Sequence, residues 1–396
     1  MRVLFISRRF FPAISGMSVY AANLLRELSR AGHDVTMISQ FRGDPAGRAV
    51  YGGGPPPPVP GVRVIGLEAR GEQAGGDFER DIDEIVSVAC DEHQTHGSFD
   101  VVHAQYGYPT GLAGLEAARR FGAPSVVSIQ GGDGHWVGSC CELHFAAMRV
   151  VCEHAGELLI GSSSFRDEVV QRLGVPPERF TLVPGAVDPV RFAPPAEGRD
   201  DGLLVYHGRV DRRKGVLDLL AAVERVPGAR LVVSGVGPDL EAVRAHASER
   251  IHVLGYVGYD DAPSVLARGG IFVSPTYAEG FSNTILEAMA AGMAIISCRS
   301  VGVVDCLRHE ENALLIDPGD VDALAAAIAR LLHEPELRRR LAAAALAEVR
   351  RTYSWSRVAG LIEDAYRRAL ETPADGSWSL PAARPPCRFR AEPHLL

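Results

Sequence analysis

The segment from Pro275 to Ala290 carries residue types that suit a hydroxylated, anionic ligand. It follows an apolar run, Ile271–Pro275, that predicts a β-strand. Ser282 can cap a helix that runs to Gly292. The N-terminus of such a helix presents unpaired backbone N–H groups and the positive end of its dipole, and an anion can bind there.

Two carboxylates accompany this helix start. Glu287 lies in the second turn of the predicted helix, where a carboxylate can accept hydrogen bonds from two vicinal hydroxyls of a ribose. Glu279 lies in the preceding loop and can reach another hydroxylated group. An ordinary capped helix with a solvated acid would contain the same residues, so this segment alone leaves both interpretations open.

A basic turn follows the predicted strand Leu203–His207. Arg209 comes just after this strand and Lys214 follows five residues later. Of the 41 Lys and Arg residues in the chain, Lys214 is the only lysine. An ammonium is a compact point charge, and two cations with the backbone N–H groups of a turn can hold a pyrophosphate. The basic turn therefore favours a diphosphate ligand.

Together these segments resemble the retaining, nucleotide-sugar-dependent glycosyltransferases of family 4, which have the GT-B fold. The resemblance extends from Arg2 to about Arg368. The motifs that carry it are E-x7-E from Glu279 to Glu287, R-x4-K from Arg209 to Lys214, the turn Gly235-Val236-Gly237-Pro238, and Pro184-Gly185-Ala186-Val187-Asp188 with Phe192.

The resemblance implies roles for individual residues. Lys214 and Arg209 would neutralise the departing diphosphate, so that no metal and no other cofactor is required, and Glu279 would bind the transferred sugar. These three would be the catalytic residues, and Glu287 would hold the donor ribose. The implied donor-binding residues are Gly16, Gly208, Arg209, Lys214, Gly235, Val257, Glu279, Gly280, Phe281, Ser282, Asn283 and Glu287.

The first half of the chain departs from the family pattern at two places. Relatives usually have two adjacent glycines where this chain has Gly16 followed by Met17, so close backbone approach to the diphosphate would depend on Gly16. Many relatives carry a histidine where this chain has Gln130, which cannot ionise. The candidate acceptor-binding residues are His103, Tyr106, Gln130, Asp133 and His135.

These candidates leave the acid/base chemistry open. Any proton transfer by the protein would fall to Asp133 or His135, or be absent, because the leaving phosphate can accept the proton of the acceptor. A lone histidine at a strand end, such as His103, is more often structural than catalytic.

Short apolar runs alternate with helical patterns along the chain, which is typical of parallel sheets built from βαβ units. We therefore expect an α/β fold of two Rossmann-like, doubly wound domains, and the resemblance implies that these domains face a cleft. The first helix would be capped by Ser18. The predicted strands are Val3–Ser7, Val35–Ser39, Val62–Gly66, Asp100–Ala104, Ser125–Ile129, Glu157–Gly161, Phe180–Pro184, Leu203–His207, Arg230–Gly235, Ile251–Gly255, Ile271–Pro275, Ala294–Ser297 and Ala313–Asp317.

The composition places the domain boundaries. We expect two domains, over residues 1–192 and 203–352, joined by a Pro/Gly/acidic linker at 193–202. The resemblance implies that the first domain binds the acceptor and the second binds the nucleotide sugar. A C-terminal helix over 353–371 would return to the first domain, and the tail from 372 to 396 would be disordered.

Composition also excludes several classes of protein. A net charge of −8 disfavours nucleic acid as a partner. The sequence shows neither a membrane span nor a signal peptide, which predicts a cytoplasmic protein, and it leaves the oligomeric state open. Seven cysteines without any C-x-x-C predict reduced thiols rather than a disulfide framework or a zinc ribbon, so we expect no metal site.

These observations predict a retaining, metal-independent glycosyltransferase. It would move a sugar from a UDP- or GDP-sugar to a hydroxyl of a small soluble acceptor, such as a sugar, polyol or aminocyclitol, in carbohydrate or antibiotic biosynthesis within secondary metabolism. The alternatives are a sugar-nucleotide epimerase and a non-catalytic sugar-nucleotide binding protein. A nicotinamide oxidoreductase would need a G-x-G-x-x-G motif after the first strand, and this chain lacks that motif there. The surroundings of Lys214 suit a diphosphate better than a pyridoxal phosphate.

Overall fold

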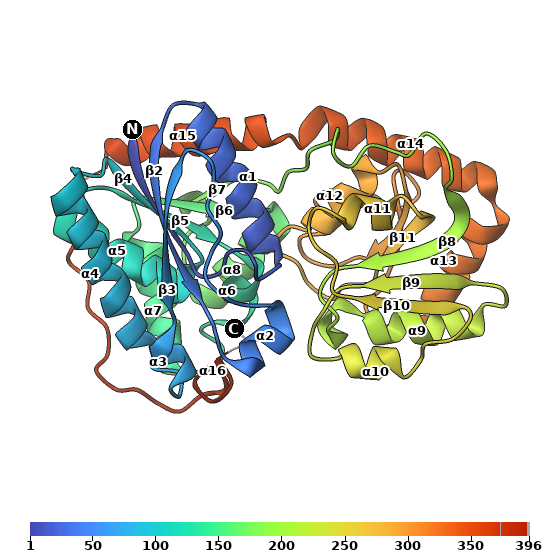
Figure 1. The fold of residues 1–396 in the computed structure, drawn as a ribbon, viewed down its shortest axis with the longest axis horizontal. Helices are drawn as coiled ribbons and strands as arrows, with labels where there is room; N and C mark the ends of the chain where they lie inside the picture. The colour runs from blue at the N-terminus through green and yellow to red at the C-terminus, as the bar shows by residue number, and fades with distance from the viewer. Residues whose placement is uncertain (373, 394–396) are drawn as a thin grey trace. The chain divides into compact units, whose positions relative to one another are not determined.

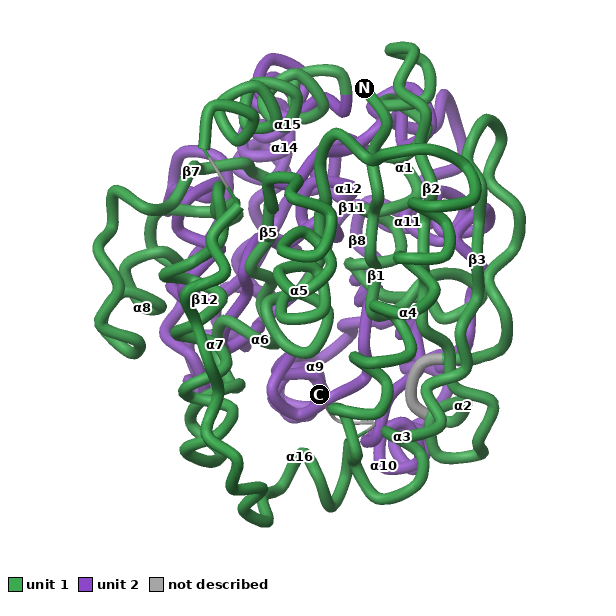
Figure 2. The backbone as a smooth tube through the Cα atoms, turned by 90° about the vertical axis from the view of Figure 1, so that its left-hand side faces the viewer, with its two compact units in different colours: residues 1–184, 356–396 green, residues 185–355 purple. Residues whose placement is uncertain are grey.

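The chain forms two α/β units, each built on one parallel sheet (Figure 1). The structure is a computed structural model that describes residues 1–372 and 374–393. Unit 1 comprises Met1–Pro184 and Ser356–Leu396, and unit 2 comprises Gly185–Trp355 (Figure 2). Residues 373 and 394–396 of the predicted tail lie outside the described residues. The predicted fold class of two doubly wound parallel sheets is confirmed.

All the predicted strands are present, with ends that differ by no more than a few residues. The strands of unit 1 are β1 (Arg2–Ser7), β2 (Asp34–Phe41), β3 (Val62–Glu68), β4 (Val101–Gln105), β5 (Ser125–Ile129), β6 (Glu157–Ile160) and β7 (Phe180–Leu182). Those of unit 2 are β8 (Asp200–His207), β9 (Arg230–Ser234), β10 (Ile251–Gly255), β11 (Gly269–Ser274), β12 (Ala294–Cys298) and β13 (Leu314–Ile316).

Helices connect these strands. Unit 1 contains α1 (Gly16–Arg30), α2 (Pro45–Tyr51), α3 (Arg70–Gln73), α4 (Phe78–His96), η1 (Gly107–Gly111), α5 (Leu112–Phe121), α6 (Gly131–Trp136), α7 (Glu142–His154), α8 (Ser163–Leu173), η2 (Pro177–Arg179) and α16 (Arg388–Ala391), and α15 (Trp355–Leu370) enters it at Ser356. Unit 2 contains η3 (Arg212–Lys214), α9 (Val216–Arg225), α10 (Leu240–Arg244), α11 (Ala262–Leu266), α12 (Asn283–Ala290), α13 (Val321–His333) and α14 (Pro335–Thr352).

The strand orders locate the crevices where ligands bind in such sheets. The order is β3-β2-β1-β4-β5-β6-β7 in unit 1 and β10-β9-β8-β11-β12-β13 in unit 2. The direction of the chain across each sheet therefore reverses between β1 and β4, and between β8 and β11. Open α/β sheets bind ligands at the carboxyl ends of the strands at such switch points. The loops after β8 and β11 carry the motifs singled out in the sequence.

Apolar side chains cover both faces of the unit 2 sheet. One buried cluster joins inward residues of β8, β9 and β11 to α9 and α13, and the other joins the opposite face to α11, α12 and α14. Because both faces are covered, the strands are buried and nearly continuously apolar. The rigid sheet fixes where its loops begin.

Two details near the chain boundaries differ from the sequence prediction. Val187 forms a bridge with Ser354, and Phe192 is buried in the core of unit 2, so this unit begins at Gly185 instead of after residue 192. Asp200 pairs with Gly269 and already belongs to β8, so the strand includes the end of the expected linker.

The helix after the first strand also begins differently. The prediction that Ser18 caps α1 is wrong, because the Oγ atom of Ser15 accepts a hydrogen bond from the Ser18 backbone N–H at 3.2 Å. Ser18 instead donates its hydroxyl hydrogen bond to the carbonyl of Ala13. Both residues can cap a helix, and the sequence spacing does not distinguish them.

Helix α15 packs on unit 1. The Tyr366 hydroxyl lies 2.7 Å from Nδ1 of His103, and Arg368 pairs with Glu157 at 3.0 Å. The tail continues along unit 1, where Phe389 is buried and Arg390 pairs with Glu79 at 2.6 Å. Among the described residues, no helix combines the length and the apolar character needed to cross a membrane.

Gly215 fixes the turn that carries Lys214. Its φ of +70° is the left-handed conformation that ends η3. A Cβ atom added at Gly215 would lie 2.0 Å from the carbonyl oxygen of Pro275. The turn after β8 therefore touches the loop after β11 at a point where only a glycine fits.

We predict that Gly215→Ala destabilises unit 2 by more than Gly228→Ala does. Gly228 has a similar φ of +79°, but a Cβ there would meet no atom within 4 Å. Both variants incur the left-handed cost of about 1–2 kcal/mol, and only Gly215→Ala adds a clash with backbone. Thermal unfolding of both variants measures the difference, and equal losses of stability would contradict the proposed close contact.

Candidate functional site

The predicted catalytic lysine and glutamate form an ion pair beside the switch point of unit 2. Nζ of Lys214, at the end of η3, lies 2.8 Å from Oε1 of Glu279 and donates to the carbonyl of Ala278 at 3.2 Å. The Lys214 side chain keeps 29% of its surface exposed. The structure thus brings these two predicted residues together.

Backbone hydrogen bonds fix the loop that carries Glu279. The Tyr277 N–H donates to the carbonyl of Arg213 at 3.1 Å, and the Glu279 N–H donates to the carbonyl of Val301 at 2.9 Å. The loop after β11 is therefore held on one side by the turn that carries Lys214 and on the other by the loop after β12. Little backbone freedom has to be lost when a ligand binds here.

Asp211 organises the arginines of the basic turn. Its buried carboxylate pairs with Arg209 at 3.1 Å and with Arg213 at 2.7 Å, and it also caps η3. Burial raises the pKa of this carboxyl, but hydrogen bonds from Arg213 and the charge of Arg209 outweigh that effect and lower it to about 2. Asp211 is thus ionised at neutral pH and orients Arg209.

The two predicted donor glycines of this region differ in their surroundings. A Cβ at Gly208 would meet no atom within 4 Å, so the backbone there is open to close approach by a ligand. A Cβ at Gly235 would lie 1.7 Å from the carbonyl oxygen of Gly208, so Gly235 is required for packing against the turn after β8. Gly235 therefore shapes the site whether or not it touches a donor.

The start of α12 has the predicted cap. The Oγ atom of Ser282 accepts from the Ile285 N–H at 3.4 Å, and Asn283 begins the helix. A Cβ at Gly185 would lie 2.2 Å from Oδ1 of Asn283 and 2.9 Å from Cδ1 of Phe281. Because Gly185 has no Cβ atom, the segment Pro184–Asp188 can pack on the start of α12.

The remaining predicted donor residues lie around the same helix start. Phe281 and Val257 are partly buried against the apolar cluster below α12. The Phe281 ring also lies 5.6 Å from that of Tyr353. Gly280 packs against Gly302, because a Cβ atom added at Gly302 would lie 3.0 Å from the carbonyl oxygen of Gly280. These packing contacts fix the walls around the end of β11.

Glu287 is buried in α12. Only 4% of the residue is exposed. Burial raises the pKa of Glu287 to about 8, although the positive charge of Arg191 works against that shift. Two donated hydrogen bonds from ribose hydroxyls would satisfy this group, which is consistent with the predicted role.

In unit 1, Gly16 occupies the first position of α1. A Cβ there would meet no atom within 4 Å. The helix start is therefore open at Gly16, and its contact with a diphosphate stays a prediction.

His103 has no free ring nitrogen. Its Nδ1 lies 2.7 Å from the Tyr366 hydroxyl and its Nε2 lies 2.8 Å from Oγ of Ser128. Burial lowers the pKa of His103 to about 3, so the ring is neutral. It connects β4, β5 and α15 through these two contacts.

Asp133 joins the loops after β4 and β5. Its carboxylate accepts from the backbone N–H groups of Gly107, Gln130 and Gly134, the last two at 2.7 and 2.9 Å. Burial raises the pKa of Asp133 to about 7, although these hydrogen bonds oppose the shift. The Tyr106 hydroxyl lies beside the start of α6, because a Cβ atom added at Gly132 would lie 2.3 Å from its oxygen. The arrangement gives Asp133 a helix-capping role.

His135 pairs with Glu168 instead of facing another predicted acceptor residue. Its Nδ1 lies 2.7 Å from Oε1 of Glu168 on α8, and its ring lies 4.6 Å from that of Phe165. Only 7% of the residue is exposed. Whether these residues of unit 1 contact an acceptor stays a prediction.

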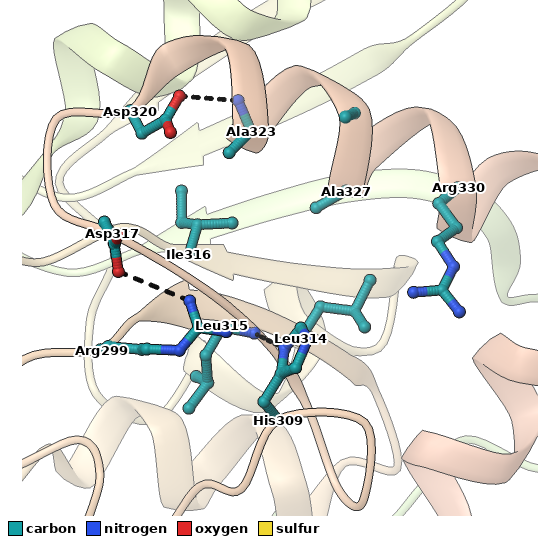
Figure 3. Close-up of a pocket in the computed structure, with 11 residues that line it drawn as sticks. Arg299, His309, Leu314, Leu315, Ile316, Asp317, Asp320, Ala323, Ala327 and Arg330 are labelled. Carbon is teal, nitrogen blue, oxygen red and sulfur yellow. Dashed lines mark hydrogen bonds and ion pairs between the residues drawn. The ribbon is translucent and has the colours of Figure 1, made fainter.

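A hollow in unit 2 lies away from these residues. It has a volume of about 310 Å³ and opens between β13, α13 and the loop at His309 (Figure 3). Its charged lining residues are Arg299, Asp317, Asp320 and Arg330, and the rest of its lining is largely aliphatic. None of the predicted site residues lines it.

The structure adds two residues that the sequence analysis did not select. Asp211 lies within the basic turn, and its spacing from Arg209 and Arg213 could have indicated an internal ion pair. The other residue is Arg191, which lies far from Glu287 in the sequence and whose positive charge opposes the rise that burial causes in the pKa of Glu287. The Cζ atom of Arg191 lies 4.2 Å from the centre of the Tyr259 ring. No local pattern in the sequence predicts that Arg191 acts on Glu287.

Comparison with known proteins identifies relatives over most of the chain. Residues 15–186 match the family model described as "Glycosyl transferase 4-like domain", and residues 201–334 match "Glycosyl transferases group 1". The chain is 28% identical over 421 residues to the MMP alpha-(1->4)-mannosyltransferase of Mycolicibacterium hassiacum, which covers 93% of this chain and 98% of that relative.

Solved structures share the fold of this chain. The sucrose-phosphate synthase of Thermosynechococcus elongatus matches with a TM-score of 0.78 at 23% identity, covering 93% of this chain and 99% of the other. HepE of Anabaena, solved in complex with UDP-glucose, matches with a TM-score of 0.73 at 14% identity over 93% of this chain and 99% of the other. At these identities the two structures establish the fold.

We predict that Glu287→Gln flattens the pH dependence of stability of the ligand-free protein. The folded chain holds a proton on Glu287 up to about pH 8, whereas the ordinary pKa is 4.5. The folded state therefore binds more protons in this interval, and the free energy of unfolding falls as the pH rises through it. The glutamine side chain of the variant cannot ionise, so this contribution is removed.

Thermal unfolding of the wild type and of Glu287→Gln between pH 5 and pH 9 tests this expectation. Glu241→Gln, an exposed site on α10, controls for the loss of one carboxylate. A decline in melting temperature with pH as steep in Glu287→Gln as in the control would contradict the buried, raised-pKa carboxyl.

Proposed function

Because this chain belongs to the family 4 glycosyltransferases and has their GT-B fold, we propose that it moves a sugar from a nucleoside diphosphate sugar to an acceptor hydroxyl, with retention and without a metal ion. The donor is a UDP- or GDP-sugar. The observation that carries the proposal is the Lys214–Glu279 pair beside the β8/β11 switch point, with Arg209 on the same turn.

The charges of the basic turn suit the leaving group. Breaking the bond between the anomeric carbon and the phosphate oxygen leaves both bonding electrons on the β-phosphate. The Lys214 ammonium and the Arg209 guanidinium stabilise this negative charge, since preorganised cations act most strongly where charge develops. Both are already held in place, by Glu279 and by Asp211 respectively.

The remaining groups bind and orient the donor. Glu287 accepts hydrogen bonds from the ribose hydroxyls, Glu279 accepts from a hydroxyl of the transferred sugar, and the N–H groups at the start of α12 face the sugar and phosphate. A ligand-bound Glu279 shares its carboxylate between Lys214 and the sugar. This geometry orients the donor before the reaction.

Retention follows from transfer on one face of the sugar. The bond to the acceptor oxygen forms on the face that the phosphate leaves, and the acceptor proton passes to the departing phosphate oxygen. This route needs no protein base. It is compatible with Gln130, with the capping role of Asp133 and with the pairing of His135 to Glu168.

The acceptor is a small molecule that presents a hydroxyl, such as a sugar, a polyol or an aminocyclitol. Support for this part of the proposal comes from the sequence of unit 1. Ten carboxylates and two arginines lie between residues 68 and 100, which disfavours docking on an anionic lipid surface. A place in secondary metabolism is part of the same proposal.

We predict that Lys214→Ala lowers the rate of sugar transfer by about 10²–10³-fold, since that is the usual effect of removing one preorganised charge-stabilising group. Arg212→Ala is the matched control, because Arg212 lies on the same turn but is 71% exposed and pairs with Asp239. We expect near wild-type transfer from that control.

The assay incubates labelled UDP- and GDP-sugars with a panel of sugars, polyols and aminocyclitols in the presence of EDTA. Transfer by the wild type, with an unchanged anomeric configuration in the product, supports the proposal. Wild-type rates from Lys214→Ala would remove the assigned role of the lysine. Nucleotide binding without any turnover would instead identify a non-catalytic binding protein.

A further inference from the structure

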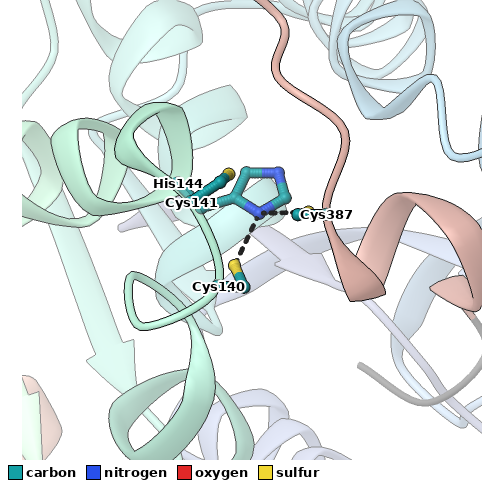
Figure 4. A group of neighbouring side chains, drawn as sticks. All are labelled: Cys140, Cys141, His144 and Cys387. Carbon is teal, nitrogen blue, oxygen red and sulfur yellow. Dashed lines mark hydrogen bonds between the residues drawn. The ribbon is translucent and has the colours of Figure 1, made fainter.

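Three cysteines and one histidine of unit 1 come together outside the predicted donor site. Cys140, Cys141, His144 and Cys387 each offer one ligand atom, and these four atoms all lie within 4.8 Å of one another (Figure 4). Nδ1 of His144 lies 3.1 Å from Sγ of Cys140 and 3.7 Å from Sγ of Cys387. The four side chains surround one small volume.

The start of α7 places two of these ligands. Cys141 is the N-cap residue, with extended dihedral angles, and His144 is the third residue of this 13-residue helix. Side chains at the N-cap and at the third helical position face each other, as they do in a capping box. The positive end of the helix dipole also favours a thiolate at this place.

The fourth ligand comes from the C-terminal tail, 243 residues after His144. Cys387 precedes α16, and the tail is held there by several contacts. Phe389 is buried, and Arg390 pairs with Glu79 at 2.6 Å and donates to the Gly76 carbonyl at 3.0 Å. The position of Cys387 thus does not depend on the cluster alone.

Burial favours a permanent site over a surface contact. His144 is fully buried, and its ring packs 4.6 Å from Tyr108 and 5.8 Å from Phe78. The three cysteines are partly buried. The aromatic walls fix the imidazole, while the thiols remain close enough to solvent for an ion to enter.

We propose that Cys140, Cys141, His144 and Cys387 bind a zinc ion that fastens the C-terminal tail to unit 1. Zinc prefers four thiolate and imidazole ligands in a tetrahedron, with Zn–S near 2.3 Å and Zn–N near 2.1 Å, which separates the ligand atoms by about 3.5–3.8 Å. The observed separations bracket this range. Calcium and magnesium prefer oxygen ligands, which this set lacks.

The proposed site is structural. Four protein ligands fill the tetrahedron, so no position is left open for a substrate or a reactive water. Three thiolates and a neutral imidazole around Zn²⁺ carry a net charge of −1, and Arg390 supplies a nearby cation on the same tail segment. The site therefore differs from a catalytic metal and is independent of the proposed metal-free transfer.

Metal content measures the proposal directly. The full-length protein, purified under reducing conditions and dialysed, should contain one zinc per chain by plasma mass spectrometry. Cys387→Ser and Cys141→Ser should each lose most of it. Cys90→Ser is the matched control, because Cys90 is a partly buried cysteine on α4 outside the cluster, and this variant should retain the metal.

A second experiment uses only the wild-type chain, so it does not depend on how the variants fold. The chelator-treated protein is titrated with Co²⁺, which should give the intense visible absorption of a tetrahedral thiolate site, and then with Zn²⁺, which should abolish that absorption and raise the melting temperature. Proteolysis of the tail should slow on zinc binding.

Two results would overturn the proposal. One is a protein that binds neither Co²⁺ nor Zn²⁺ while all its thiols are titratable. The other is a disulfide from Cys387 to Cys140 or Cys141 in protein kept reduced, seen as a cross-linked peptide in mass spectrometry. Neither outcome changes the expectation for sugar transfer, so the two proposals fail separately.

Discussion

The donor site depends on the backbone contact between the turn after β8 and the loop after β11. Gly215 lies against the carbonyl of Pro275, and the Tyr277 N–H donates to the carbonyl of Arg213. Strands β8 and β11 are adjacent where the strand order reverses. Their loops therefore begin side by side, and the contact fixes Lys214 against Glu279. Without it, a flexible lysine would pay the entropy of ordering each time a donor bound.

The charges of the site are organised in two different ways. Arg209 and Lys214 are each held by a carboxylate, so the cations are oriented before a ligand arrives. Glu287 is buried with a raised pKa, which makes its ionisation in the ligand-free site costly at alkaline pH. Hydroxyl groups of a ligand would offset that cost. Preorganised cations and a buried carboxyl group together suit a ligand that has one anionic part and one hydroxylated part.

Much of this arrangement could be predicted from the sequence, and the failures have physical causes. The strands and the cap at Ser282 were predictable because apolar runs end at turn residues and a helix needs a local cap. Ser15 and Ser18 can both cap a helix, so the start of α1 was assigned to the wrong residue. Nothing local shows that Arg191 lies near Glu287, or that Cys387 joins Cys140, because tertiary packing alone brings them together. The expectation of no metal site followed from local cysteine spacing, which carries no information about side chains that the tertiary fold brings together, and it stays a prediction beside the proposed zinc site.

The most direct test is a calorimetric titration of UDP, GDP, ADP and TDP into the protein, with EDTA present, for the wild type, Lys214→Ala and Arg212→Ala. We expect one diphosphate to bind the wild type and Arg212→Ala with similar affinity and to bind Lys214→Ala much more weakly. Equal affinity in all three proteins, or binding that requires a divalent metal, would contradict the assignment of the basic turn as the diphosphate site.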